Sequence, residues 1–218
     1  MNTFTLNHIH LAEAYARPFF ERDHSGHDWD HIQRVRRTAL FLCQEEKCEN
    51  LYGVDLIALL HDAGDPKLHN TISQADDALK KIVSRLDLSA DAGHFLIDSI
   101  KAVSFNGGHE KKLTGIEAAI VRDADRLDAI GAIGIARAFA YGGSRGSKLY
   151  DEEINIRHSM TEHEYRTNQS TSIHHFYEKL FKLKDRMITE SGKKLAEDRH
   201  RYMEGFVKQF LKEWKGNI

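Results

Sequence analysis

One histidine and two aspartates stand together where an apolar stretch of the sequence ends. The segment ALLHDAGDPK carries His61 and Asp62 directly after Ala58–Leu60, and Asp65 follows three positions later. Imidazole and carboxylate groups are costly in an apolar setting unless something compensates them. A metal ion, a hydrogen-bond network or a solvated helix end would each do so, and this segment alone leaves the three alternatives open.

Two other segments place metal-competent side chains among apolar neighbours. His31 lies in DWDHIQRV, and Asp125 lies in RDADRLDAIG. Imidazole nitrogens and carboxylate oxygens together suit divalent first-row metals and leave positions for water. Adjacent residues of an ideal helix point about 100° apart. His61 and Asp62 could therefore share one ion only at a helix end, and Gly64 is a plausible place for a helix to stop.

The elements that must position these residues are predicted to be helices throughout. Apolar residues recur at helical spacing along most of the chain, and VDLIALLHDAG is apolar on nearly all sides, which is typical of a buried central helix. Thr71 or Ser73, Ser89 and Thr114 are the predicted N-terminal caps of later helices. The expected helices cover residues 6–22, 28–46, 54–64, 71–88, 89–105, 115–143, 170–191 and 193–215, and the polar, glycine-marked segment 142–165 is the expected mobile loop.

Composition and charge restrict the class of protein. Residues 1–218 suit one domain, here expected as a metal-site core over roughly 20–140 with C-terminal helices 170–215 packed on it. The net charge of −2, from 31 basic and 33 acidic residues, gives no basic excess for nucleic-acid binding. The two cysteines, the lack of a secretory signal pattern and the lack of a bilayer-length apolar run predict a cytoplasmic protein without a membrane partner.

Four phrases give the chain its resemblance to a known family. HDWDHIQRV, LLHDAGDPK, DADRLDAIGAIGIAR and HFYEKLFKL…GKKLA resemble the HD-domain metal-dependent phosphohydrolase superfamily, over nearly the whole chain. They are most similar to a bacterial subgroup of small single-domain proteins that resemble nucleoside-triphosphate pyrophosphohydrolases. The resemblance implies an all-α HD-domain helical bundle, a nucleotide substrate and one divalent metal ion, whose identity (Mn, Fe, Co, Ni or Mg) stays open.

The resemblance also implies roles for particular residues. His31, His61, Asp62 and Asp125 match the metal ligands, and Asp65 stands where a related carboxylate orients the attacking water, although some relatives have Glu there. Cations that could bind phosphate oxygens are Arg34, one turn from His31, then Lys67, Arg145 in the expected loop, and Lys179. Asp128 could contact metal or ribose, or could form an ion pair with Arg126 or Arg122.

Other functions remain open at this stage. A nucleoside-monophosphate phosphatase or a cyclic-nucleotide phosphodiesterase would use the same ligands and would differ in its products. A regulatory module that binds nucleotide or metal without turnover is the non-enzymatic alternative, and the presence of Asp65 argues against it. The sequence names neither the base, sugar and phosphate count of the substrate nor the oligomeric state.

Overall fold

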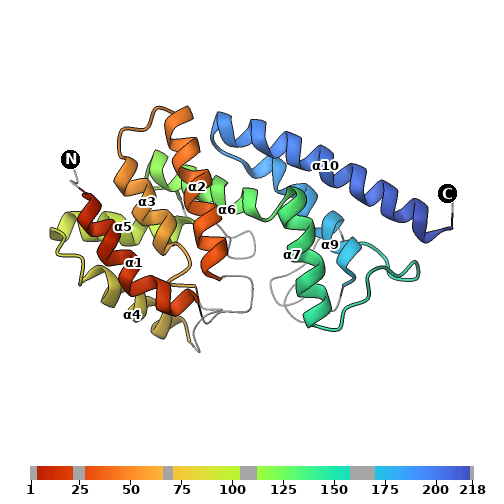
Figure 1. The fold of residues 1–218 in the computed structure, drawn as a ribbon, viewed down its shortest axis with the longest axis horizontal. Coiled ribbons are helices and arrows are strands. Elements are labelled where there is room, and N and C mark those ends of the chain that lie inside the picture. The colour runs from red at the N-terminus through yellow and green to blue at the C-terminus, as the bar shows by residue number, and fades with distance from the viewer. Residues whose placement is uncertain (1–3, 22–27, 66–70, 104–111, 158–169, 217–218) are drawn as a thin grey trace. The chain divides into compact units, whose positions relative to one another are not determined.

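The computed structural model describes residues 4–21, 28–65, 71–103, 112–157 and 170–216 of the chain (Figure 1). By its internal contacts the chain divides into two compact units, Met1–Asp125 and Arg126–Ile218. The described residues form helices and turns and contain no strand, which confirms the all-α prediction. The expectation of one domain over 1–218 stays a prediction.

The first unit is built around one short buried helix. This helix, α3 (Leu51–Leu60), packs against three others of the unit, and its residues 53–60 are all buried. Such burial follows from its sequence, which is apolar on nearly every side. The other helices that supply residues to this unit are α1 (Leu6–Phe20), α2 (Trp29–Glu45), α4 (Ile72–Val83), α5 (Ala90–Val103) and α6 (Ile116–Asp128).

Side-chain caps fix where several of these helices begin. The Asp28 carboxylate accepts a hydrogen bond from the His31 backbone N–H at 2.7 Å, at the first turn of α2. The hydroxyls of Thr71 and Ser89 do the same for α4 and α5, as the sequence predicts. Each cap satisfies a backbone donor that has no partner within its own helix. The cap on α2 therefore holds the turn that presents His31.

A buried ion pair joins the helices around α3. The Arg36 guanidinium of α2 donates two hydrogen bonds to the Asp55 carboxylate of α3, at 2.7 and 3.0 Å. A third bond from Arg36 reaches Glu13 of α1 at 3.2 Å. Both members of the pair are largely shielded from solvent, so the two hydrogen bonds are needed to compensate for desolvation. The pair therefore joins α2 to α3.

The prediction of one long helix over 115–143 is wrong. Two helices are present instead, because α6 ends at Asp128 and α7 (Gly131–Ser144) starts after a break. Ile130 is extended, and Gly131 has φ +75°, a left-handed conformation that cannot continue a right-handed helix and that suits glycine. The small residues that made the segment look continuous therefore include the one that interrupts it.

The prediction of one helix over 170–191 is also wrong. Helix α9 (Ser172–Glu178) is followed by two 3₁₀ turns, Leu180–Lys182 and Lys184–Arg186, before α10 (Glu190–Trp214) begins. The backbone leaves the helical region at Lys179 and again at Met187. These turns bury Leu180, Leu183 and Met187. Burial of those side chains outweighs the helical propensity of the segment.

Among the described residues, no helix is both long enough and apolar enough to cross a lipid bilayer.

Candidate metal centre

Three helices of the first unit bring the predicted ligands together. His31 lies in the first turn of α2, Asp125 lies near the end of α6, and His61 and Asp62 directly follow α3. The stop of α3 at Leu60 comes earlier than the predicted stop at Gly64. Residues 61–64 form a turn, in which the Ala63 N–H donates to the Leu60 carbonyl oxygen at 2.9 Å, and the side chains of His61 and Asp62 both reach the cluster from it.

The ligand atoms of these residues lie close to one another. The Nε2 atoms of His31 and His61 are 3.3 Å apart, and Asp62 Oδ2 is 3.4 and 3.3 Å from them, respectively. Asp125 Oδ1 lies 3.5 Å from His31 Nε2 and 3.8 Å from His61 Nε2. Ligand atoms about 2.0–2.2 Å from one divalent ion are separated by roughly 3.0–3.6 Å when they are neighbours. Four of the five observed separations lie in that range and the fifth, between Asp125 Oδ1 and His61 Nε2, is slightly longer at 3.8 Å, so the cluster could hold one ion.

Burial distinguishes three of these side chains from the fourth. His31 and His61 are almost completely buried and Asp62 nearly so, whereas 30% of the Asp125 side chain is exposed. The three buried residues form the group with metal-binding geometry among the described residues. The exposed side of Asp125 leaves an approach from solvent, which a centre that reacts with a soluble substrate requires.

A backbone hydrogen bond orients the His61 ring. His61 Nδ1 lies 2.8 Å from the carbonyl oxygen of Ala58, one turn earlier, and must donate because a carbonyl can only accept. The Nε2 lone pair is then directed at the cluster. Bonds of this kind to the outer ring nitrogen are the usual way in which proteins fix a metal-binding histidine.

The electrostatics of the cluster favour a cation. Burial alone would lower the pKa of His61, but the charge and hydrogen bond of Asp62, together with the charge of Asp125 and the Ala58 carbonyl, raise it to about 9. A raised imidazole pKa means that the surrounding carboxylates stabilise positive charge at this point. A divalent ion would take the place of that proton and would satisfy the same negative charge.

Asp65 lies directly after the turn that presents the HD pair. Its backbone N–H donates to the carbonyl oxygen of Asp62 at 2.9 Å, and its side chain is half-buried. The turn therefore connects the predicted base to a predicted ligand through a backbone hydrogen bond. Its role in catalysis stays a prediction.

The predicted substrate residues have different environments. Arg34 is half-buried on α2, one turn after His31, as helical spacing predicts. Lys67 lies outside the described residues. The other three belong to the second unit: Asp128 is buried, Arg145 is exposed at the end of α7, and Lys179 is half-buried at the end of α9. Their contact with substrate stays a prediction.

Two of these residues have contacts that sequence reasoning missed. Asp128 Oδ2 accepts a hydrogen bond from Arg137 Nη1 at 2.6 Å, and Arg137 was not among the predicted partners. The two residues are nine positions apart and lie on different helices, so helical spacing gave no signal for this bond. Arg145 lies over the Tyr141 ring, 5.7 Å from its centroid. The expected loop also starts later than predicted, because α7 continues to Ser144.

The buried Arg122, which the sequence offered as a possible partner of Asp128, anchors α6. Arg122 donates from Nε to the carbonyl oxygen of Ala102, near the end of α5, at 2.9 Å. Arg122 precedes Asp125 by three positions and so lies on a neighbouring part of the same helix face. The bond therefore fixes the helix that presents the fourth carboxylate.

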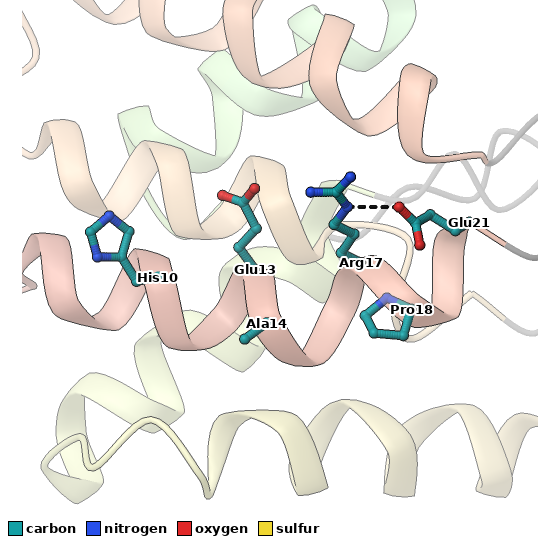
Figure 2. A pocket seen from close by; sticks show the side chains of 6 residues that line it. All are labelled: His10, Glu13, Ala14, Arg17, Pro18 and Glu21. Atoms are coloured by element: carbon teal, nitrogen blue, oxygen red, sulfur yellow. Dashed lines mark hydrogen bonds and ion pairs between the residues drawn. The ribbon is translucent and has the colours of Figure 1, made fainter.

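A separate surface groove runs along α1. It is lined by His10, Glu13, Ala14, Arg17, Pro18 and Glu21, and Figure 2 shows these side chains along one helix, with Arg17 Nε bonded to Glu21 Oε1 at 2.7 Å. None of the predicted site residues lines this groove. Arg17 and Glu21 pair with each other and Glu13 pairs with Arg36, so we place the candidate site at the His–Asp cluster.

Known proteins resemble the chain over almost all of its length. Bacillus subtilis YpgQ is 36% identical over 213 residues, covering 97% of this chain and 96% of YpgQ. The structure of YpgQ in complex with ADP has a TM-score of 0.73, at 32% identity, and covers 95% of this chain and 100% of that one.

Two further crystal structures support the same relationship. A Lactobacillus plantarum protein has a TM-score of 0.85 and 40% identity, covering 98% of this chain and 100% of its own. An HD-superfamily hydrolase from Bacillus thuringiensis has a TM-score of 0.73 and 38% identity, covering 95% of this chain and 96% of its own. No family model matches the sequence.

These likenesses and the His–Asp cluster define the class. The chain belongs to the HD superfamily of hydrolases, in the group that contains YpgQ. It is a metal-dependent phosphohydrolase. The resemblance inferred from the four sequence phrases is thereby confirmed.

Proposed function

We propose that His31, His61, Asp62 and Asp125 hold one divalent ion, and that the enzyme hydrolyses nucleoside triphosphates to a monophosphate and pyrophosphate. The observation that carries the proposal is the convergence of four ligand atoms, each within 3.8 Å of His61 Nε2 or His31 Nε2. Two imidazoles and two carboxylates suit a first-row divalent ion or magnesium. When bound, such an ion lowers the pKa of water and polarises a phosphoryl oxygen.

Asp65 is the residue to which we assign proton transfer. It follows the turn after the HD pair, outside the group of buried ligands, and is half-buried rather than buried. A carboxylate in that position can orient a water molecule and accept its proton. The side chain is one methylene shorter than Glu, so we expect the contact to the water to depend on the position of this turn.

Arg34 is the residue to which we assign the phosphates beyond the reacting one. Its spacing of three residues from His31 on α2 supports a position on the side of the helix that carries the cluster. A net charge of −2 gives no long-range attraction for a polyphosphate, so a local cation beside the metal is required. The complex of YpgQ with ADP supports a nucleotide as the ligand class. Lys67, Asp128, Arg145 and Lys179 stay predictions as further contacts.

The product identifies the reaction. Incubation of purified protein with single nucleoside triphosphates and one divalent metal at a time, followed by ³¹P NMR, separates the alternatives. We expect pyrophosphate and nucleoside monophosphate in equal amounts, without an early inorganic phosphate signal. Phosphate as the sole primary product would replace the proposal with a phosphatase, and ring opening of a cyclic nucleotide alone would replace it with a phosphodiesterase.

A matched pair of variants assigns the activity to the cluster. His61→Ala removes a ligand, and His200→Ala removes a buried histidine of α10 in the second unit. Loss of pyrophosphate release in the first variant, with retention in the second, supports the proposal. Equal activity of the two variants would show that the observed hydrolysis comes from a different site or from a contaminant.

A further inference from the structure

The two cysteines of the chain occupy paired positions in one helix-ending motif. Helix α2 ends at Glu45, and Lys47, two residues later, has the left-handed backbone (φ +54°) that closes the helix. The Cys48 backbone N–H donates to the Cys43 carbonyl oxygen at 2.9 Å, and the Lys47 N–H donates to the Gln44 carbonyl at 3.1 Å. These two bonds define a Schellman motif, in which the first and last residues normally bring their side chains into contact. In this chain both residues are cysteine.

The Cys43 thiol contacts the backbone of Cys48. Cys43 is buried and its Sγ donates to the Cys48 carbonyl oxygen at 3.3 Å, while Cys48 is partly exposed. The Cys48 nitrogen lies 2.9 Å from the Cys43 carbonyl oxygen, so covalent geometry keeps the two α-carbons within about 6.8 Å of each other. Disulfides form with α-carbon separations of about 4.4–6.8 Å. The motif therefore holds the two cysteines at an α-carbon separation within the range that a disulfide can span.

We propose that Cys43 and Cys48 are a modification site, at which a hydroperoxide converts the two thiols into a reversible intramolecular disulfide. The Cys48 thiol attacks the peroxide, which gives a sulfenic acid and one molecule of water (or alcohol). The Cys43 thiol then attacks that sulfur, so that the S–S bond forms and the sulfenic oxygen leaves as water. Two thiols lose two electrons and two protons, and the peroxide O–O bond is reduced.

The environment of each thiol sets the order of the two steps. Burial, the neighbouring Cys48 thiol and the charge of Glu117 raise the pKa of Cys43 to about 12. Because the thiolate is the nucleophile, Cys43 is a poor first target for a dissolved oxidant. Cys48 is the more exposed of the two and lies beside its resolving partner. A sulfenic acid at Cys48 would thus be captured within the same chain.

The pair is independent of the proposed hydrolysis. Cys43 is 12 residues beyond His31 on one helix, which corresponds to about 18 Å along the axis. Oxidation of the two cysteines can therefore be tested independently of the metal centre.

Intact-mass spectrometry of the full-length protein after treatment with hydrogen peroxide tests the proposal. We expect the wild type to lose 2 Da, to remain monomeric on non-reducing gels, and to recover both thiols with dithiothreitol. Diamide, which forms disulfides without transferring oxygen, should give the same product. Disulfide-linked dimers, or sulfinic and sulfonic acids as the main products in wild type, would overturn it.

Single-thiol variants test the order of the steps. Cys43→Ser should leave Cys48 without its partner, so that peroxide adds 16 or 32 Da to this variant. In Cys48→Ser only the Cys43 thiol remains. We expect peroxide to oxidise it at least about tenfold more slowly than it oxidises the first thiol of the wild type, because little of Cys43 is thiolate. Loss of the Cys43 thiol at the wild-type rate in that variant would contradict the proposal.

Discussion

The Arg36–Asp55 ion pair allows a stability prediction with a definite magnitude. Replacing Asp55 by Ala removes both acceptors of the short bonds at 2.7 and 3.0 Å and leaves Arg36 between α2 and α3. Only 13% of the Arg36 side chain is exposed, so water cannot fully replace the lost carboxylate. Loss of one partner from a buried pair costs about 3–5 kcal/mol. Glu13, at 3.2 Å, remains as a partner and lowers our expectation to about 2–4 kcal/mol.

Tryptophan fluorescence can follow the affected unit alone. The chain has two tryptophans, Trp29 at the start of α2 and Trp214 at the end of α10. In a Trp214→Phe background, Trp29 reports urea unfolding of the first unit, which contains the ion pair. We expect Asp55→Ala to lower the free energy of unfolding by the stated amount with little change in the slope against urea.

A second substitution separates the pair from its individual members. Combining Asp55→Ala with Arg36→Met removes the stranded charge and should recover a large part of the lost stability, because the buried guanidinium no longer needs a partner. If Asp55→Ala changed the unfolding free energy by less than about 0.5 kcal/mol, as surface substitutions do, the pair would not stabilise the contact between α2 and α3.

Three further predictions concern catalysis, substrate selection and pH. Asp65→Asn should retain the metal and lose about 10²–10⁴-fold in kcat, and a near wild-type rate would remove Asp65 from the mechanism. Arg34→Ala should reduce kcat/KM for a nucleoside triphosphate more than for a small aryl phosphate. Equal losses would show that Arg34 contacts only the reacting phosphate or has a structural role. Although burial raises the pKa of Glu178, its hydrogen bonds with Arg157 hold that pKa below the ordinary value of 4.5. The stability that this carboxylate adds is present above pH 4.5 and is lost as the pH falls through the lowered pKa. Thermal melts from pH 6 to 3 should therefore fall less steeply for Glu178→Gln than for wild type, and identical slopes would contradict this origin.

Local patterns predict several of the helices, and the family resemblance predicts that the four candidate ligands lie together. The apolar character of VDLIALL predicts the burial of α3, and Thr71 and Ser89 identify the starts of their helices through short-range hydrogen bonds. The cluster was predicted as a set because His31, the HD pair and Asp125 each lie within a segment that resembles a known family. Their separations were not predictable from any one segment.

The predicted helices were wrong where a backbone conformation or a burial pattern without a local sequence signal decides the structure. Small residues on both sides of Gly131 favour one continuous helix, and its left-handed backbone is visible only in the structure. The segment after Glu178 has helical spacing, yet it forms 3₁₀ turns that bury Leu180 and Leu183. The bond from Arg137 to Asp128 depends on that same break at Gly131. None of these contacts has a local sequence signal.

The metal content of matched variants tests the central claim most directly. Elemental analysis of purified wild type, His61→Ala and His200→Ala, after the same dialysis and with folding checked by circular dichroism, measures the ions bound per chain. We predict about one divalent ion in wild type and in His200→Ala, and almost none in His61→Ala, because four ligands at one centre imply one ion. A His61→Ala protein that is folded and keeps the wild-type metal content would show that the cluster of His31, His61, Asp62 and Asp125 is not the metal centre.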